Sequence, residues 1–289
     1  METLHQIVVA ARERLARAGL PPDSAAIDAE VLARLVLGWD RATYLAERGD
    51  PPPPGFAAAF EPLLARRAAR EPVAQILGRR EFWGRDFEVS RDVLTPRPES
   101  EIIVEAALDC ARQLRGTRPG APFRLVDVGT GSGCLAITLA LELPDACVVA
   151  TDISPAALGV ARRNAARLGA AGVGFVETSL LDGLAPGFDV IVSNPPYVPL
   201  RVRRALSPDV RDFEPHEALF GGDDGLDVIR ALLDQAACAL APDGVLIMEF
   251  GAGQDEEVRA LVAERPRLDL LVVRTDLQGI DRVAVARRQ

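Results

Sequence analysis

The residues Asn194, Pro195, Pro196 and Tyr197 follow an apolar segment, FDVIVS, that is typical of a buried strand. Two successive prolines fix the backbone and leave no N–H to donate at either position, so this loop is rigid and rich in acceptors. The Asn194 side-chain oxygen and the Pro195 carbonyl can both accept from one planar NH2 group, on which Tyr197 can stack. This pattern favours chemistry on an amide or amine nitrogen, because two acceptors stabilise the charge that develops as the nitrogen attacks. A rigid turn without chemistry is the alternative, since the chain has 22 prolines.

A glycine-rich loop follows an earlier apolar strand, Phe123–Val128, and precedes an apolar helix. Glycines alternate in it with small polar residues: Gly129, Thr130, Gly131, Ser132 and Gly133. Glycines let the backbone turn sharply and leave room for a ligand at the strand end. Asp152 ends the next strand about 20 residues later, the spacing of an acid that binds a nucleoside ribose. The glycine loop and Asp152 together predict a nucleoside cofactor. The alternative is that the glycines only permit a tight turn and that Asp152 only caps the following helix.

The charge beside the loop discriminates between cofactors. The loop lacks the last glycine of the GxGxxG dinucleotide fingerprint. Asp127 immediately precedes it, and a carboxylate there would repel a pyrophosphate but could pair with an ammonium group. S-adenosylmethionine has an α-amino group, a sulfonium and no phosphate. We therefore expect S-adenosylmethionine rather than NAD.

These loops require a sheet whose strand ends meet at one edge. Strands are predicted near residues 124–128, 147–152, 173–176, 188–193, 244–250, 268–275 and 282–287, with helices between most of them. This alternation is typical of an α/β, Rossmann-like parallel sheet with helices on both faces. The last two strands are joined by a short turn at Gln278–Gly279, so an antiparallel hairpin is expected at the sheet edge.

The first part of the chain has a different character. Helical periodicity predicts a small bundle over residues 1–70, with helices ending at Gly19 and Gly38, and further helices near 41–48 and 57–70. Residues 71–95 are interpreted as a connector that contains a β-hairpin turning at Gly84–Arg85–Asp86. The domain that contains the sheet is then expected over 96–289, beginning with a helix near 98–114. The bundle is either a packing module or a substrate-docking domain.

Composition excludes several classes of function. All 33 basic residues are arginine, so no lysine nucleophile is available, and the net charge of −9 argues against a protein that wraps nucleic acid. The four cysteines form no CxxC pair and only two histidines accompany them, so a metal site is not expected. No apolar run approaches the 18 residues of a membrane span. We expect a protein of the cytoplasm.

Several motifs in combination resemble the HemK/PrmC family, the release factor glutamine N5-methyltransferases. They extend over nearly the whole chain: ILGRREFWGRDFEV, VLTPRPESE, DVGTGSG, TD, SNPPY, LSPDVRDFEPHEALFGGDDGLD and DLQGIDRVAVARR. The resemblance implies a seven-stranded class I methyltransferase fold and S-adenosylmethionine as cofactor. It also implies class 1 peptide chain release factors as protein substrates, methylated on the glutamine of their GGQ loop. Neither nucleic acid nor membrane is expected as a direct partner. The oligomeric state is not fixed by the sequence, and a monomer is expected.

By this resemblance, Gly129–Gly133 and Asp152 bind the cofactor, while Asn194–Tyr197 bind the target glutamine, with Asn194 also near the methyl donor. Arg97 and Glu99 are expected at the pocket entrance, although a helix start would explain them equally well.

One departure from the family pattern concerns the adenine. Leu180 is expected to cover the adenine face, whereas Ser179 stands where the family usually has an acid. Two alternatives stay open from the residues: methylation of adenine N6 in nucleic acid, whose planar NH2 group would suit the same loop, and a catalytically silent binding protein.

Overall fold

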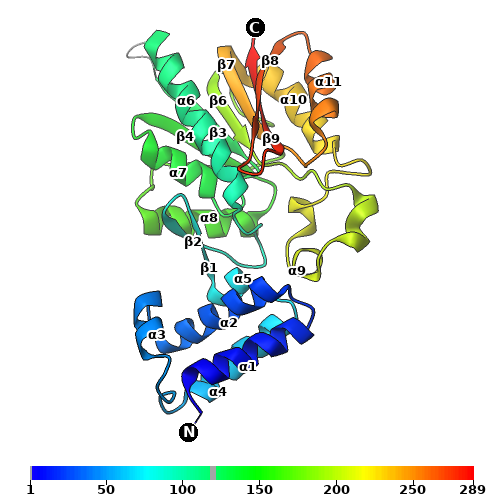
Figure 1. Cartoon of the computed structure of the whole chain (residues 1–289). Helices are drawn as coiled ribbons and strands as arrows, with labels where there is room; N and C mark the ends of the chain where they lie inside the picture. Colours follow the sequence, from blue (N-terminus) through cyan, green and yellow to red (C-terminus); the bar gives the residue numbers. More distant parts are fainter. Residues whose placement is uncertain (1, 118–121) are drawn as a thin grey trace. The chain divides into compact units, whose positions relative to one another are not determined.

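The computed structural model describes residues 2–117 and 122–289, and the chain forms two compact units (Figure 1). One unit comprises the residues up to Arg79 together with Ser207–Phe213, and we call it the helical unit. The other comprises Arg80–Leu206 and Glu214–Gln289, and we call it the sheet unit. The chain therefore passes from one unit to the other three times.

Within the described residues the helical unit contains six helices, five of which contribute side chains to one apolar core. They are α1 (Leu4–Arg17), α2 (Pro22–Leu37), α3 (Arg41–Glu47), α4 (Phe56–Ala68), α5 (Val73–Leu77) and α9 (Pro208–Arg211). Local signals set the helix ends: Thr3 and Gln6 form a capping box at the start of α1, and Gly38 ends α2 in the left-handed conformation. The four helices predicted from periodicity are present, whereas α5 lies in the segment interpreted as a connector. Its five residues are too few to show a helical period.

A buried ion network ties residues 207–213 to the bundle. The Arg67 guanidinium lies 2.6 Å from the Asp28 carboxylate and 2.8 Å from that of Asp209. Arg70 also pairs with Asp209 at 2.5 Å, and the Gln75 side chain donates to the Phe213 carbonyl at 3.0 Å. Removing one partner from such a buried network leaves an uncompensated charge, so the network fixes segment 207–213 within this unit.

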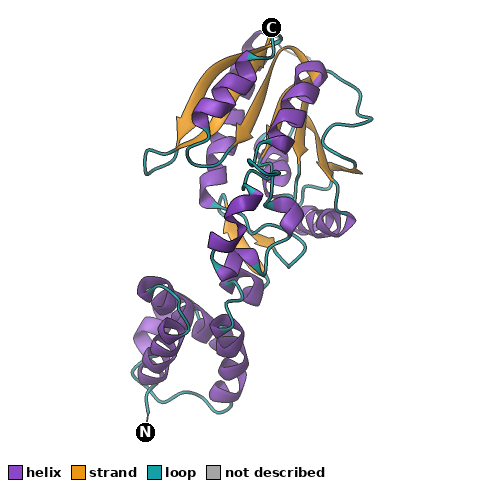
Figure 2. Cartoon of the chain, turned by 90° about the vertical axis from the view of Figure 1, so that its right-hand side faces the viewer, coloured by secondary structure: helices purple, strands orange, loops and turns teal. Residues whose placement is uncertain are grey.

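The sheet unit contains a seven-stranded sheet with the order β5-β4-β3-β6-β7-β9-β8 (Figure 2). The strands are β3 (Phe123–Val128), β4 (Ala146–Asp152), β5 (Gly174–Glu177), β6 (Phe188–Ser193), β7 (Leu240–Glu249), β8 (Leu268–Thr275) and β9 (Asp281–Arg288). The first five are parallel, and β9 is antiparallel to both β7 and β8. The predicted doubly wound sheet with its antiparallel edge hairpin is confirmed.

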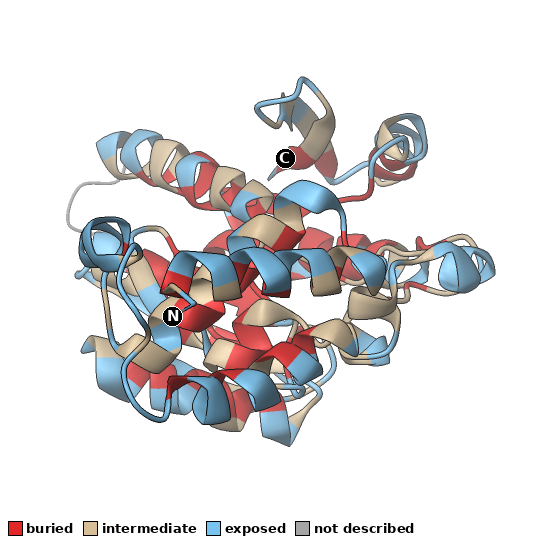
Figure 3. Ribbon diagram, turned by 60° about the horizontal axis from the view of Figure 1, so that its bottom comes forward, coloured by how far each residue is buried: buried red, intermediate tan, exposed pale blue. Residues whose placement is uncertain are grey.

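Helices cover both faces of this sheet. On one face pack α6 (Glu101–Thr117), α7 (Cys134–Glu142) and α8 (Pro155–Leu168), and on the other α10 (Asp227–Ala239) and α11 (Asp255–Ala263). Alternate residues of each strand face the two layers: in β3, Leu125 joins the first core and Val126 the second. Buried positions accordingly run along one side of the helices and exposed positions along the other (Figure 3).

Two boundaries differ from the sequence predictions. The hairpin of β1 (Arg79–Phe82) and β2 (Arg85–Glu88) turns at Trp83–Gly84 rather than at residues 84–86, because both turn residues adopt positive φ, which suits a two-residue hairpin. Strand β7 begins four positions before the predicted residue 244. Leu240 already pairs with Phe188, and a register shift follows in which Asp243 takes a positive φ, so Pro242–Asp243–Gly244 resembles a turn in the sequence.

Short helical segments also escaped prediction. Two 3-10 turns, η2 (Leu200–Ala205) and η3 (His216–Ala218), follow the NPPY loop and were not predicted. A third, η1 (Pro98–Ser100), precedes α6 and is the first turn of the helix predicted to begin near residue 98. Each is too short for a periodic pattern. Among the residues that the structure describes, none of the helices combines the length and apolar character that a membrane crossing needs.

Candidate active site

The predicted functional loops meet at one edge of the sheet. Strands β4, β3, β6 and β7 are consecutive and parallel, so their carboxyl ends lie side by side. These ends carry Asp152, the glycine loop after Val128, the NPPY loop after Ser193, and Glu249. The carboxyl edge of an open α/β sheet is where ligands bind.

The glycine loop adopts a conformation that requires glycine. Gly129, Gly131 and Gly133 all have positive φ, at 72°, 53° and 83°. A Cβ on Gly133 would also lie 2.7 Å from Ile137 and 3.1 Å from Ala161, so no side chain fits there. Sequence spacing predicted the loop, and the structure explains its third glycine by close packing between α7 and α8.

Asp127 lies behind this loop. Its side chain is fully buried, and its Oδ2 accepts from the Thr130 hydroxyl at 2.6 Å and from the Ala136 N–H at 3.1 Å. Burial raises the pKa of Asp127 to about 7, against the two donors that lower it. Its Oδ1 has no hydrogen-bond partner among the described residues, and Asp127 does not line the adjoining cavity. The observed contacts make it a support of the loop, and its predicted pairing with an ammonium group stays a prediction.

Asp152 is held in place by backbone donors. Its Oδ2 accepts from the Gly131 N–H and its Oδ1 from the Ser154 N–H, both at 2.9 Å. These bonds leave further lone pairs on the carboxylate, which lines the cavity and can accept from ribose hydroxyls. The spacing between Gly131 and Asp152 in the sequence thus corresponds to a direct contact.

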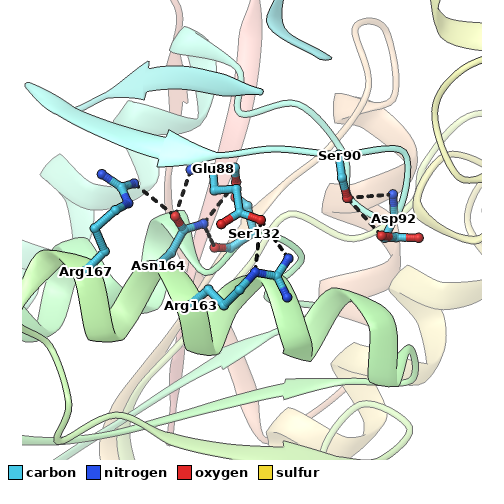
Figure 4. A network of polar contacts seen from close by, with 7 residues as sticks. All are labelled: Glu88, Ser90, Asp92, Ser132, Arg163, Asn164 and Arg167. Carbon is cyan, nitrogen blue, oxygen red and sulfur yellow. Dashed lines mark hydrogen bonds and ion pairs between the residues drawn. The ribbon is translucent and has the colours of Figure 1, made fainter. Parts of the chain in front are cut away.

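Asn164 on α8 joins the glycine loop to the β1–β2 hairpin (Figure 4). Its NH2 group donates to the carbonyls of Ser132 at 2.9 Å and Glu88 at 3.0 Å, while its oxygen accepts from the Glu88 N–H at 2.7 Å. The side chain is fully buried. Because every end of this amide is engaged with backbone, Asn164 fixes the glycine loop against the connector.

A cavity of about 730 Å³ adjoins the glycine loop. It is lined by residues of the predicted sites together with residues of the loops around them: Arg97, Ser100, Gly129, Thr130, Gly131, Ser132, Asp152, Ser179, Leu180, Asn194, Pro196 and Phe220. Leu180 has a positive φ of 51°, an uncommon conformation for a branched side chain, and such strain concentrates at ligand sites. Glu99, Pro195 and Tyr197 do not line this cavity.

The donor and acceptor groups of the cavity fit S-adenosylmethionine. Asp152 offers acceptors to a ribose, and Leu180 offers an apolar surface to an adenine. Among the described residues that line the cavity, the one arginine is Arg97, whose Nη2 lies 2.6 Å from Glu214, so this lining holds no unpaired cation for a pyrophosphate. Burial raises the pKa of Glu214, while Arg97 acts in the opposite direction.

The NPPY loop is fixed at both ends by side chains. Asn194 donates its NH2 group to the Ser100 hydroxyl at 2.9 Å, and that hydroxyl donates to Glu249 at 2.6 Å. Tyr197 donates its hydroxyl to the other oxygen of Glu249 at 3.0 Å. The Asn194 oxygen is therefore the end of the amide that stays available to accept from a substrate.

Glycines surround the backbone of the same loop. A Cβ on Gly221 would overlap the Pro196 carbonyl, and one on Gly225 would overlap the Tyr197 carbonyl. Tyr197 lines a second cavity of about 700 Å³ and packs against the core beneath α10 and α11. Burial and the charge of Glu249 raise the pKa of its hydroxyl. The predicted stacking of Tyr197 on a planar amide stays a prediction.

Four residues of this site were missed by sequence reasoning. Ser100, Asn164, Glu214 and Glu249 all act through contacts with residues distant in the chain. Glu249 had a visible signal, because it is an acid at the end of the apolar strand VLIME at the functional edge. Ser100 and Glu214 lie in the stretches VLTPRPESE and FEPHEAL, although no local pattern marks their individual roles, and Asn164 resembles an ordinary helix residue.

Comparison with known proteins identifies the family. Residues 6–78 match the PrmC N-terminal domain, and residues 111–207 match the methyltransferase small domain. A protein of Cereibacter sphaeroides named release factor glutamine methyltransferase is 48% identical over 282 residues, which cover 96% of each chain. The chain belongs to the release factor glutamine methyltransferases. The expected membership of the HemK/PrmC family is confirmed.

Other members and a solved structure extend this result. A release factor glutamine methyltransferase of Geobacter sulfurreducens is 41% identical over 286 residues, covering 99% of this chain and 96% of its own. The solved catalytic domain of hMettl16, in complex with a 3'UTR hairpin, is 14% identical and superposes with a TM-score of 0.57 over 89% of this chain and 90% of its own. At that identity the likeness concerns the fold alone, and it agrees with the class I methyltransferase fold.

Proposed function

We propose that this protein transfers a methyl group from S-adenosylmethionine to the side-chain amide nitrogen (N5) of the glutamine in the GGQ loop of class 1 peptide chain release factors. The observation that carries the proposal is the Asn194–Ser100 bond at the wall of the cavity that also contains the glycine loop and Asp152. It orients an amide oxygen as an acceptor beside a site suited to a nucleoside cofactor. Family membership supplies the substrate class.

The residues of the site would act by binding and orientation. When bound, S-adenosylmethionine supplies a methyl group on a sulfonium that leaves as a neutral sulfide. The Asn194 oxygen, with the Pro195 carbonyl as the predicted second acceptor, would hold the two hydrogens of the target amide. These bonds strengthen as positive charge develops on the attacking nitrogen. A methylated amide nitrogen is then strongly acidic and releases its proton without a dedicated base, which agrees with a site built from amide, hydroxyl and carbonyl groups.

Alignment would account for most of the rate. An amide nitrogen is a weak nucleophile because its lone pair is delocalised, and holding it in line with the methyl group removes an orientational cost of up to about 7–11 kcal/mol. The rigid NPPY loop, fixed through Ser100 and Glu249 and by close contacts of its backbone with Gly221 and Gly225, is suited to this task.

The proposal includes the finer expectations about partners. We infer that the protein acts in the cytoplasm, where release factors function, and that it does so as a monomer. The net charge of −9 disfavours nucleic acid as its direct partner.

The test is a peptide mass map of a purified release factor after incubation with the enzyme and S-adenosylmethionine. One added methyl group on the GGQ-containing peptide, located on the glutamine by fragmentation, is the expected result. Duplex DNA is added in a competing reaction with labelled methyl donor. Label in the DNA and none in the release factor would overturn the proposal in favour of adenine methylation, and label in neither would overturn it altogether.

A further inference from the structure

A single buried carboxylate holds both ends of the NPPY loop. Glu249 is the last residue of β7 and is 2% exposed. Its Oε2 accepts from Ser100, which in turn accepts from Asn194, and its Oε1 accepts from Tyr197. The first and last residues of the loop are thus linked through one side chain from a neighbouring strand.

The direction of these bonds requires a carboxylate. Both Ser100 and Tyr197 donate to Glu249, so both of its oxygens must accept, which a carboxylate can do and an amide cannot. Because the Ser100 proton points to Glu249, the Ser100 oxygen presents a lone pair to Asn194 and selects the NH2 end of that amide. The free end of Asn194 is then its oxygen.

Stability alone does not explain an acid at this position. The described ion pairs include none with Glu249: Arg282, whose charge acts on it, pairs with Asp276 at 3.0 Å. Burial raises the pKa of Glu249, and the charge of Glu99 raises it further, so both disfavour the ionised form. The two hydroxyl donors and the charge of Arg282 act in the opposite direction. A buried charge without an ion partner costs free energy that an apolar residue would avoid.

We infer that Glu249 is a positioning residue that sets the orientation of the Asn194 amide and the place of Tyr197 for methyl transfer. The inference rests on the proposed function. Glu249 lines neither of the two cavities, so it acts through Ser100 and Tyr197 and not by contact with a ligand.

The isosteric variant Glu249→Gln tests this. An amide at this position places an NH2 group against one of the two hydroxyls, and a reversed Ser100 would donate to the Asn194 oxygen and turn its NH2 group toward the substrate. We expect kcat for release factor methylation to fall by up to about 100-fold. The affinity for S-adenosylmethionine, measured by calorimetry, should stay within about twofold, because Glu249 does not line the cofactor cavity. Glu105→Gln, the same change at an exposed position of α6, is the control and should leave both quantities unchanged.

Ser100→Ala provides a second measurement if the glutamine variant does not fold. It breaks the same link and keeps the carboxylate of Glu249, and kcat measured at saturating S-adenosylmethionine should again fall by at least tenfold. Cofactor affinity is compared for Glu249→Gln alone, because Ser100 itself lines the cofactor cavity. The double variant should be no slower than the slower single variant, because both changes break one chain of contacts. Full kcat in either single variant, or loss of cofactor affinity in parallel with kcat in Glu249→Gln, would overturn the inference. An inactive wild-type enzyme would instead contradict the proposed function.

Discussion

Asn194 donates its side-chain NH2 group to the hydroxyl of Ser100, a residue 94 positions earlier in the chain, over 2.9 Å. The NPPY motif supplies the amide, but the end of that amide facing the cavity is selected by a residue outside the motif. Ser100 belongs to the PRPESE stretch, which precedes the sheet in sequence. The functional unit is therefore a contact between two motifs.

Replacing Asn194 by alanine should lower kcat by about 10²–10³, by analogy with the loss of one donor from an oxyanion hole. The variant removes an acceptor that acts on the developing charge and leaves the backbone of the loop in place. Single-turnover methyl transfer to a GGQ-containing release factor measures the effect. Gln278→Ala, which removes an exposed amide from the β8–β9 turn, should react at the wild-type rate. Near wild-type turnover by the Asn194 variant would refute the role assigned to this residue.

Replacing Asp152 by asparagine should weaken S-adenosylmethionine binding. The new NH2 group would face the N–H of Gly131 or Ser154, and a charged acceptor for the ribose would be lost. A hydrogen bond to a charged group contributes about 1.5–3 kcal/mol, so the dissociation constant should rise by about 10- to 100-fold. Isothermal titration calorimetry tests this, with Asp23→Asn on an exposed turn of the helical unit as the control. Equal affinities for the two variants would exclude Asp152 from the cofactor site.

The stability of the ligand-free protein should depend on pH through Asp127. Its pKa is raised from 3.8 to about 7 in the folded protein. A carboxyl group with a raised folded-state pKa stabilises the fold fully below the unfolded value, and this contribution is lost as pH rises toward the folded value. Within this window the loss amounts to about 1.4 kcal/mol per pH unit.

Asp127→Asn removes this titration and keeps an acceptor for Thr130. The free energy of unfolding of the variant should therefore rise relative to that of the wild type as pH increases from about 4 to about 7. Urea unfolding at several pH values measures the free energy of unfolding of both proteins. The contributions of the other titrating groups cancel in the difference between the two proteins. Parallel stability curves for the two proteins would show that Asp127 ionises normally.

Replacing Asn164 by alanine should destabilise the sheet unit by about 1–3 kcal/mol, because the carbonyl of Ser132 and the N–H of Glu88 lose buried partners. The affinity for S-adenosylmethionine should fall as well, since the glycine loop loses its link to α8. Arg163 neighbours Asn164 on α8, and Arg163→Ala breaks the exposed ion pair with Glu88 of β2, which should cost no more than about 1 kcal/mol. If both variants unfold at the same urea concentration, the Asn164 contacts are not what holds the loop.

Sequence patterns were sufficient for the features that depend on local geometry. The alternating glycines, the acid of Asp152 and the prolines at 195 and 196 each impose a backbone form or spacing that is visible in the residues themselves. The seven strands could be predicted because buried parallel strands form continuous apolar runs, as in residues 188–193. The start of β7 could not, since the residues that pair with Phe188 precede a segment that looks like a turn.

The residues that hold the site loops in place could not be predicted in this way. Ser100, Asn164 and Glu249 matter because of partners that lie between 32 and 149 positions away in the chain. No local period or spacing encodes such a pairing. The sequence signals a role for Glu249 only, because an acid directly follows the apolar strand segment VLIM at the functional edge.

The way in which Asp209 is held by Arg67 and Arg70 limits how this enzyme can be re-engineered. A chimera that exchanges the amino-terminal bundle for that of a distant relative would bring new side chains against Ser207–Phe213, a stretch encoded far downstream. The two pieces must therefore be transplanted together, and recombination that separates them is expected to yield poorly folded hybrids.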